Sequence, residues 1–397
     1  MARWMKTIAI VIVLAVATAG CKKKKEAEPE PTPTPVTAPT TPETPKADAG
    51  EAPAVADAAA TPAEAAAEPV DAAEEEAEAE PTWEELVASS KPLSPTVAPQ
   101  KLGEKEITAD ICTFEGIEVL ADSTMDVMNS IAITSDGKLY MVDGGGQIMR
   151  FAFKEGDDCV LVYDSAFGEN GKLKLEREIE TINVDGNNRL YASNGIFENY
   201  VMNEGTVAYP CETDPNGYIV PSPDGTMGIN YWSHADAAKI TFSDTECKSE
   251  KWAVESPIEM LHSAAFLGDL VLLGGSVKVE GTDKSNNLVL AFNKDGKEQF
   301  RIGSTAENIA DDTFCWVHGI TACPSGICVL DSNCRKMVVY SDKGELAGKI
   351  DLSALFGLDY PWYPDFQMVG DVLYVGAGQA REVSDVAQGF IYRVHGL

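Results

Sequence analysis

The stretch GITACPSGICVLDSNCRKMVVYS, residues 319–341, holds the pattern that decides the fold. Apolar and polar residues alternate in three short runs, and the turn sequences Pro-Ser-Gly and Asp-Ser-Asn separate the runs. Such alternation between turns is typical of consecutive antiparallel strands. The stretch also contains three cysteines. They could be metal ligands, a redox pair or partners in disulfides.

The same strand–turn–strand pattern recurs along the chain from about residue 110 onward. Its best examples are residues 130–151, 180–195, 218–234, 263–275, 319–341 and 365–378. These are six units of roughly 40–55 residues, each with room for four strands, and such a period is typical of propellers and other repeat folds. We therefore predict an all-β fold over residues 108–397, a six-bladed β-propeller, with two β-sandwich domains as the alternative.

Segment 319–341 resembles an NHL-type propeller repeat. The shared features are Gly-Ile at the start, a Pro-x-Gly turn, an apolar strand ending in Asp, and a polar turn before the third strand. The resemblance is close over units one and five and looser over the others. It implies a six-bladed β-propeller and leaves the function open, because one fold carries many functions.

The two ends of the repeat region indicate how the ring closes. The last unit offers strands near 364–369, 372–377 and 388–394 and lacks a fourth strand. The segment ICTFEGIEVL, residues 111–120, has no unit of its own. We expect this N-terminal strand to pair with the C-terminal unit, since closure leaves only short, protected sheet edges.

The amino terminus reads as an export signal. A basic start, MARWMK, precedes a short apolar run and the small residues TAG, so residues 1–20 fit a signal peptide. Because the signal ends at Cys21, it resembles the lipobox of bacterial lipoproteins. The resemblance implies cleavage before Cys21 and lipidation of its thiol; an uncleaved membrane anchor is the alternative.

Residues 21–107 are predicted to be a linker. Four lysines, Lys22 to Lys25, follow the lipidated cysteine and suit anionic headgroups, or else act only as a solubilising spacer. The following Glu/Pro/Ala/Thr-rich sequence lacks the apolar residues that would offset its ordering entropy, so we expect it to be disordered. A capping-box pattern predicts one short helix at residues 82–90.

Charge restricts the partners. Residues 108–397 carry 44 acidic and 21 basic side chains, and the whole chain has a net charge of −32. Nucleic-acid binding needs a basic face, so we exclude it. The signal and the anchor place the protein in the bacterial cell envelope, and Lys22 after Cys21 favours the outer membrane by analogy.

The eight cysteines after Cys21 form an even set in an exported protein, which favours disulfides. Hairpin register and shared loop faces suggest two bridges, and proximity to outer strands suggests two more. The predicted pairs are Cys323–Cys328, Cys315–Cys334, Cys112–Cys159 and Cys211–Cys247. Zinc binding by the C-x4-C-x5-C segment is the alternative, although the spacing departs from the usual zinc pattern. No C-x-x-C redox motif is present.

Two histidines precede the innermost strands of their units at matching positions, His262 and His318. In the same register other units present Asn129 and Glu180, and Asp365 is nearby. We expect these side chains to converge on one mouth of the propeller channel, where they could hold a divalent metal such as Zn, Cu or Ca. The alternative is that they are solvated polar groups that serve the loop backbone.

Three tryptophans, Trp232, Trp316 and Trp362, fall near loop ends on the same face and could form a groove for a ligand, or else pack between blades. Motifs for serine hydrolases, zinc proteases and nucleotide binding are absent. We therefore expect a lipid-anchored module that binds an envelope protein, a peptide or a glycan rather than an enzyme. The alternatives are a metal-assisted hydrolase or lyase at the channel mouth and a structural scaffold.

Overall fold

The computed structural model describes residues 80–397, except for seven short gaps. These gaps are residues 123–126, 157–158, 197, 233–236, 280–284, 304–313 and 383–384. The predicted signal peptide, the lipidation site Cys21 and most of the predicted linker lie outside the described residues.

The predicted short helix is present as α1 (Trp83–Ser89). The Thr82 hydroxyl accepts a hydrogen bond from the Glu85 backbone N–H, and the Glu85 carboxylate accepts one from the Thr82 N–H, which is the expected capping box. The other described helix is α2 (Leu352–Phe356), which is capped by Asp351 before its first residue and by Gly357, in the left-handed conformation, after its last. Within the described residues, neither helix has the length and apolar character to cross a bilayer.

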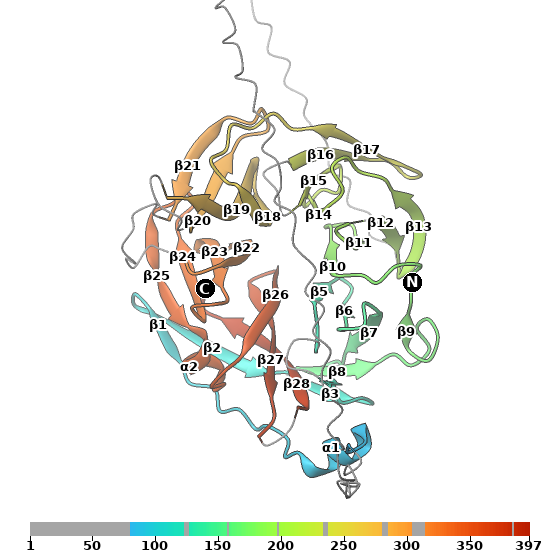
Figure 1. Cartoon of the computed structure of the whole chain (residues 1–397). Coiled ribbons are helices and arrows are strands. Elements are labelled where there is room, and N and C mark those ends of the chain that lie inside the picture. The colour runs from blue at the N-terminus through green and yellow to red at the C-terminus, as the bar shows by residue number, and fades with distance from the viewer. Residues whose placement is uncertain are drawn as a thin grey trace, which may run out of the picture. The chain divides into compact units, whose positions relative to one another are not determined.

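Six sheets, one for each repeat unit, are arranged in a ring, and the consecutive strands of each unit pair antiparallel (Figure 1). Blade 1 contains β5 (Ser130–Ile133), β6 (Lys138–Val142), β7 (Ile148–Phe153) and β8 (Val160–Tyr163), and β9 (Lys172–Leu173) pairs with β7. Blade 2 contains β10 (Thr181–Val184), β11 (Arg189–Ser193), β12 (Asn199–Asn203) and β13 (Thr206–Cys211). Blade 3 contains β14 (Tyr218–Pro221), β15 (Met227–Tyr231), β16 (Ala237–Phe242) and β17 (Cys247–Lys251).

The remaining three blades repeat this order. Blade 4 contains β18 (Met260–Leu267), β19 (Leu270–Lys278), β20 (Ser285–Phe292) and β21 (Glu298–Ile302). Blade 5 contains β22 (Val317–Cys323), β23 (Gly326–Asp331), β24 (Lys336–Tyr340) and β25 (Leu346–Asp351). Blade 6 contains β26 (Trp362–Val369), β27 (Val372–Ala380) and β28 (Ala387–His395). The predicted six-bladed propeller is confirmed, and the two-sandwich alternative is wrong, because each unit forms its own sheet.

Six apolar clusters fill the spaces between neighbouring blades, one cluster for each junction. Alternate residues of a middle strand therefore contact different neighbours. In β6, Leu139 and Met141 face blade 6, whereas Tyr140 and Val142 face blade 2. Because both faces of a blade are covered, its middle strand reads as a continuous apolar run rather than as a half-buried alternation.

The N-terminal segment joins blades 6 and 1. Strand β2 (Lys105–Ile111) lies antiparallel to β28, with Thr108 opposite His395, and β1 (Gln100–Leu102) pairs with β2 on the outside. Strand β3 (Thr113–Glu115) then runs parallel to β8 of blade 1. The strand beside β28 is thus formed mainly by residues that precede the expected segment, 111–120. That segment touches β28 only at its two ends, through Ile111 and Cys112 at one end and through β4 (Leu120–Ala121) at the other.

The four disulfides join the cysteines in the predicted pairs. Cys112 lies between β2 and β3, so its bond to Cys159 attaches the segment that crosses from blade 6 to blade 1. Cys323 and Cys328 bridge the two inner strands of blade 5 across their turn. The cysteines of the opening segment are therefore disulfides, and the zinc alternative for them is wrong.

Candidate functional site

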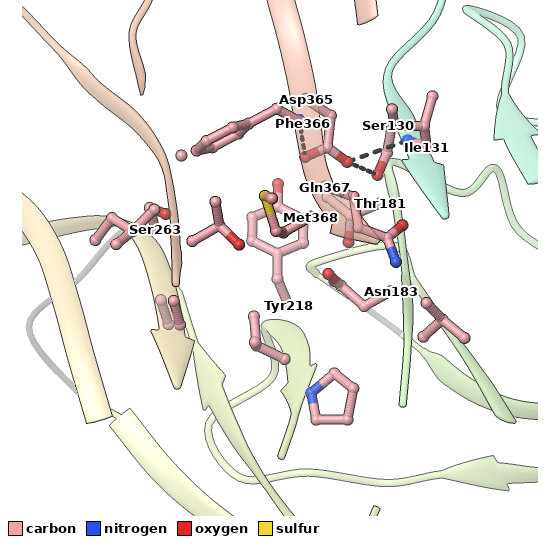
Figure 2. Close-up of a pocket in the computed structure, with 18 of the residues that line it drawn as sticks. Ser130, Ile131, Thr181, Asn183, Tyr218, Ser263, Asp365, Phe366, Gln367 and Met368 are labelled. Atoms are coloured by element: carbon pink, nitrogen blue, oxygen red, sulfur yellow. Dashed lines mark hydrogen bonds between the residues drawn. The ribbon is translucent and has the colours of Figure 1, made fainter. Parts of the chain in front are cut away.

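A cavity of about 840 Å³ lies between the six inner strands of the propeller. Figure 2 shows part of its wall, with Asp365 and Gln367 of blade 6 facing Thr181 and Asn183 of blade 2. The polar residues of the wall include Asn129, Ser130, Thr181, Asn183, Tyr218, His262, Ser263, His318, Asp365 and Gln367. Among the described residues, no lysine or arginine lines the cavity.

One end of the cavity is the end at which the inner strands begin, and we call it the top mouth. The predicted residues that line the cavity at or near this end are Asn129, His262, His318, Asp365, Trp232 and Trp316. Glu180 and Trp362 are not part of the lining. The predicted convergence on one mouth is therefore observed for six of the eight positions.

Aromatic rings form much of the top mouth. The imidazole of His262 stacks on the indole of Trp316, with 3.7 Å between ring centroids and 32° between planes. The ring of Tyr218 contacts that of Trp232, with 5.6 Å between centroids. The three rings of Trp232, Trp316 and Tyr218 are each partly exposed, so they present apolar faces at the entrance to a cavity.

The two histidines are uncharged at neutral pH. Burial lowers the pKa of His262 to about 4, and the neighbouring His318 contributes to this shift. Burial also lowers the pKa of His318, although its Nε2 lies 2.7 Å from the Pro364 carbonyl oxygen. A carbonyl oxygen only accepts, so Nε2 carries the proton and Nδ1 is the unprotonated nitrogen. The Nε2 atom of His262 is buried without a partner.

The predicted metal set is not assembled. The side chains of His262, His318, Glu180 and Asp365 do not form a group of three or more whose ligand atoms lie close enough to share one ion. The Glu180 carboxylate instead accepts a hydrogen bond from the Tyr218 hydroxyl. In the described part of the chain, the one group with such spacing is Cys315, Asp331 and Cys334, and its two sulfurs are joined in a disulfide.

Asp365 is a structural link between blades 6 and 1 instead of a ligand. One carboxylate oxygen accepts hydrogen bonds from the Ser130 hydroxyl at 2.5 Å and the Ile131 N–H at 3.1 Å (Figure 2). The other oxygen accepts from the Phe366 N–H at 2.8 Å. Two strand positions further along, the Gln367 amide exchanges two hydrogen bonds with the backbone of Ile133.

The inner wall continues this pattern into the next blades. Ser130 Oγ, whose proton is donated to Asp365, accepts a hydrogen bond from the Ile182 N–H at 3.1 Å, which links β5 to β10. Asn183 Nδ2 donates to the Ile219 carbonyl at 2.9 Å, which links β10 to β14. Sequence reasoning missed Ser130, Asn183 and Gln367; the available signal was a polar side chain inside each apolar inner strand.

Burial raises the pKa of Asp365 to about 6, because its effect is larger than that of the hydrogen bonds to the carboxylate, which lower the pKa. The folded protein therefore keeps the Asp365 proton over a pH range in which the unfolded chain, with a pKa near 4, has lost it. We expect this group to lower the free energy of unfolding by up to about 3 kcal/mol as the pH rises from about 4 to above 6. Urea unfolding of Asp365→Asn should lack this fall, whereas the exposed neighbour Asp371→Asn should retain it. Equal pH slopes in both variants would refute the assignment.

Two further predicted residues have packing or backbone roles. Asn129 donates from its backbone N–H to the Val142 carbonyl, and its side-chain amide lies 3.4 Å from the Asp143 carbonyl. Trp362 packs against the apolar cluster of blades 6 and 1, and a Cβ atom on Gly378 would lie 2.3 Å from its ring. Of the two roles considered for Trp362, the structure shows packing between blades, because the absence of a side chain at Gly378 leaves room for its indole against β27.

The segment that opened the sequence analysis positions the mouth. Asp331, at the end of β23, is fully buried, and its carboxylate accepts hydrogen bonds from the backbone N–H groups of Cys315, Trp316 and Cys334. The Cys315–Cys334 disulfide closes the same loop. The backbone that carries the indole of Trp316 is therefore held in place by the Asp331 carboxylate and by the disulfide of the preceding residue.

No family model matches the chain, and no curated protein matches it significantly. Among solved structures, the chain is similar to the WD40 β-propeller domain of Doa1. This similarity has a TM-score of 0.42 and 11% sequence identity, and it covers 70% of this chain and 97% of that one. It carries no argument about function, and the number of blades follows from the strand pairing itself.

Proposed function

We propose that this protein is a lipid-anchored binding module of the bacterial cell envelope. Its propeller would capture a protein, a peptide or a glycan at the top mouth. The observation that supports binding is the set of partly exposed aromatic rings around a cavity of about 840 Å³, a volume typical of ligand pockets. Tryptophan and tyrosine supply large contact areas at low entropic cost and dominate binding hot spots.

The proposed anchor rests on the sequence alone. Lipidation of Cys21 beside four lysines would supply the two membrane signals that stable attachment requires. The Glu/Pro-rich linker would then hold the propeller at a distance from the outer membrane. The NHL-type character of the repeats likewise stays a prediction.

Replacing Cys21 by serine is expected to abolish lipid attachment, because a hydroxyl cannot take the place of the thiol in thioether formation. Cells fed an alkyne-labelled fatty acid should label the native protein and leave Cys21→Ser unlabelled. The variant should also move from the membrane to the soluble fraction. Equal labelling of both proteins would show that Cys21 is not the attachment site.

The binding proposal can be tested without knowing the ligand. A random peptide library and a glycan array would each be screened against the purified full-length protein, with Trp316→Ala as the counter-selection. We expect ligands that bind the native protein and lose binding to the variant. If every ligand bound both proteins equally, the top mouth would not be the binding site.

A further inference from the structure

We propose that the top mouth selects a cationic side chain, the guanidinium of an arginine or the ammonium of a lysine, on a partner protein or peptide. This inference rests on the proposed binding function and names its ligand chemistry. It is drawn from the charge of the cavity wall, the aromatic rim and the loops beside the rim.

The wall carries no positive charge. No lysine or arginine of the described residues lines the cavity, and its two histidines are neutral because burial lowers the pKa of both. The wall also holds two carboxyl groups: Asp185 toward the far end, which is buried and paired with Arg189, and Asp365 near the top mouth, which is hydrogen-bonded to Ser130 and Ile131. A cation entering the cavity therefore meets no like charge in the lining, so the wall does not oppose a cationic ligand.

The rim supplies the surface that a cation prefers. The face of an indole attracts ammonium and guanidinium groups through its quadrupole, and tryptophan does so best among the aromatic residues. Trp232 and Trp316 both line the cavity at this mouth, each beside a second ring. Such rings also accept the apolar stem of a lysine or arginine side chain.

Two of the loops beside the rim add a local negative field. Residues 212–217 lead into β14 and residues 252–259 lead into β18, the two inner strands that carry Tyr218 and His262. These loops hold four exposed carboxylates and no lysine or arginine: Glu212, Asp214, Glu255 and Glu259. Negative charge around an entrance concentrates cationic ligands and speeds their association.

A neutral sugar would also stack on the rim, so charge has to be separated from shape. Arginine and citrulline have nearly the same shape, but citrulline is uncharged. The full-length protein would carry 5-fluorotryptophan, and its ¹⁹F resonances would be assigned with single Trp→Phe variants. It would be titrated with Nα-acetyl-arginine amide, with the citrulline analogue and with N-acetylglucosamine.

We expect arginine amide to shift the resonances of Trp316 and Trp232 in a saturable way, and citrulline amide to bind at least tenfold more weakly. The resonance of Trp252, which is buried in the cluster between blades 3 and 4, should stay in place as the internal control. Equal responses to arginine and citrulline amides would overturn the inference, as would an equal shift of Trp252.

Met260 offers a matched test of charge at the rim. Its side chain lines the cavity and is 41% exposed, so polar replacements are compatible with folding. Affinity for arginine amide should rise in the order Met260→Lys, Met260→Gln, Met260→Glu, with at least a threefold step between the lysine and glutamine variants. The same affinity in all three would contradict a charge-selective mouth.

The outcomes also separate this inference from the proposed function. If N-acetylglucosamine or a neutral selected peptide shifts Trp316 while arginine amide does not, the mouth is a binding site and the cationic preference is wrong. If selected ligands bind the protein but leave Trp316 and Trp232 unmoved, the binding site lies elsewhere, and both proposals fail.

Discussion

Replacing Cys112 and Cys159 together by alanine is expected to lower the free energy of unfolding by about 4 kcal/mol, the loop-closure estimate for a bridge between residues 47 positions apart. The bridge also has a special place in the ring. Residues 105–115 pass from blade 6 to blade 1, and Cys112 donates its backbone N–H to the Ile391 carbonyl of β28. Without the disulfide, this junction depends on short strands and on the apolar cluster between blades 6 and 1.

The matched control is the disulfide within the inner hairpin of blade 5. Cys323 and Cys328 are separated by 5 positions, so removing both sulfurs should cost only about 2 kcal/mol by the same estimate. Urea unfolding of the native protein and the two double variants under oxidising conditions measures the difference. Equal losses in both variants would contradict a closing role for the N-terminal segment.

Asp331→Ala is expected to lower the free energy of unfolding by about 3 kcal/mol and to weaken ligand binding as well. The change removes the acceptor of three backbone N–H groups, those of Cys315, Trp316 and Cys334, and each group left buried without a partner costs about 1–3 kcal/mol. Lys336 also loses a charge partner at 3.6 Å.

This variant separates the role of Asp331 from that of an ordinary turn residue. Asp342, an exposed carboxylate in the next turn of the same blade, is the control, and Asp342→Ala should change stability by less than about 0.5 kcal/mol. The second readout is the ¹⁹F resonance of Trp316, which should broaden or move in Asp331→Ala without any ligand. A sharp, unmoved resonance would show that Asp331 does not position the indole.

Much of the fold could be predicted because short-range sequence patterns mark the strands and turns of each unit. Turn residues such as Asp-Gly and Pro-Ser-Gly mark where strands end, and the apolar runs between them mark the middle strands. The cysteine pairs followed once the register of the units was known. The strand beside β28 was placed too late in the chain, because KEITADI (105–111) is an outer strand with a weak apolar pattern.

The candidate site was predictable in position and less so in chemistry. The register of the repeat units placed His262, His318 and Asp365 at one mouth. It could not show that the Asp365 carboxylate accepts hydrogen bonds from Ser130 and Ile131. Those bonds join residues 234 or more positions apart, so they depend on how the first and last blades meet. Trp316 and Trp362 likewise look alike in the sequence, and only the packing against Gly378 separates them.

The most direct test of the binding site is the dissociation constant of one selected ligand, measured by calorimetry with native protein, Trp316→Ala and Leu346→Ala. Leu346 is 48% exposed on the outer strand β25 and serves as the control for losing an exposed apolar side chain. We expect Trp316→Ala to weaken binding about 30-fold or more, as for a hot-spot residue worth at least about 2 kcal/mol, and Leu346→Ala to leave it within twofold. Unchanged affinity in Trp316→Ala would contradict the assignment of the top mouth as the binding site.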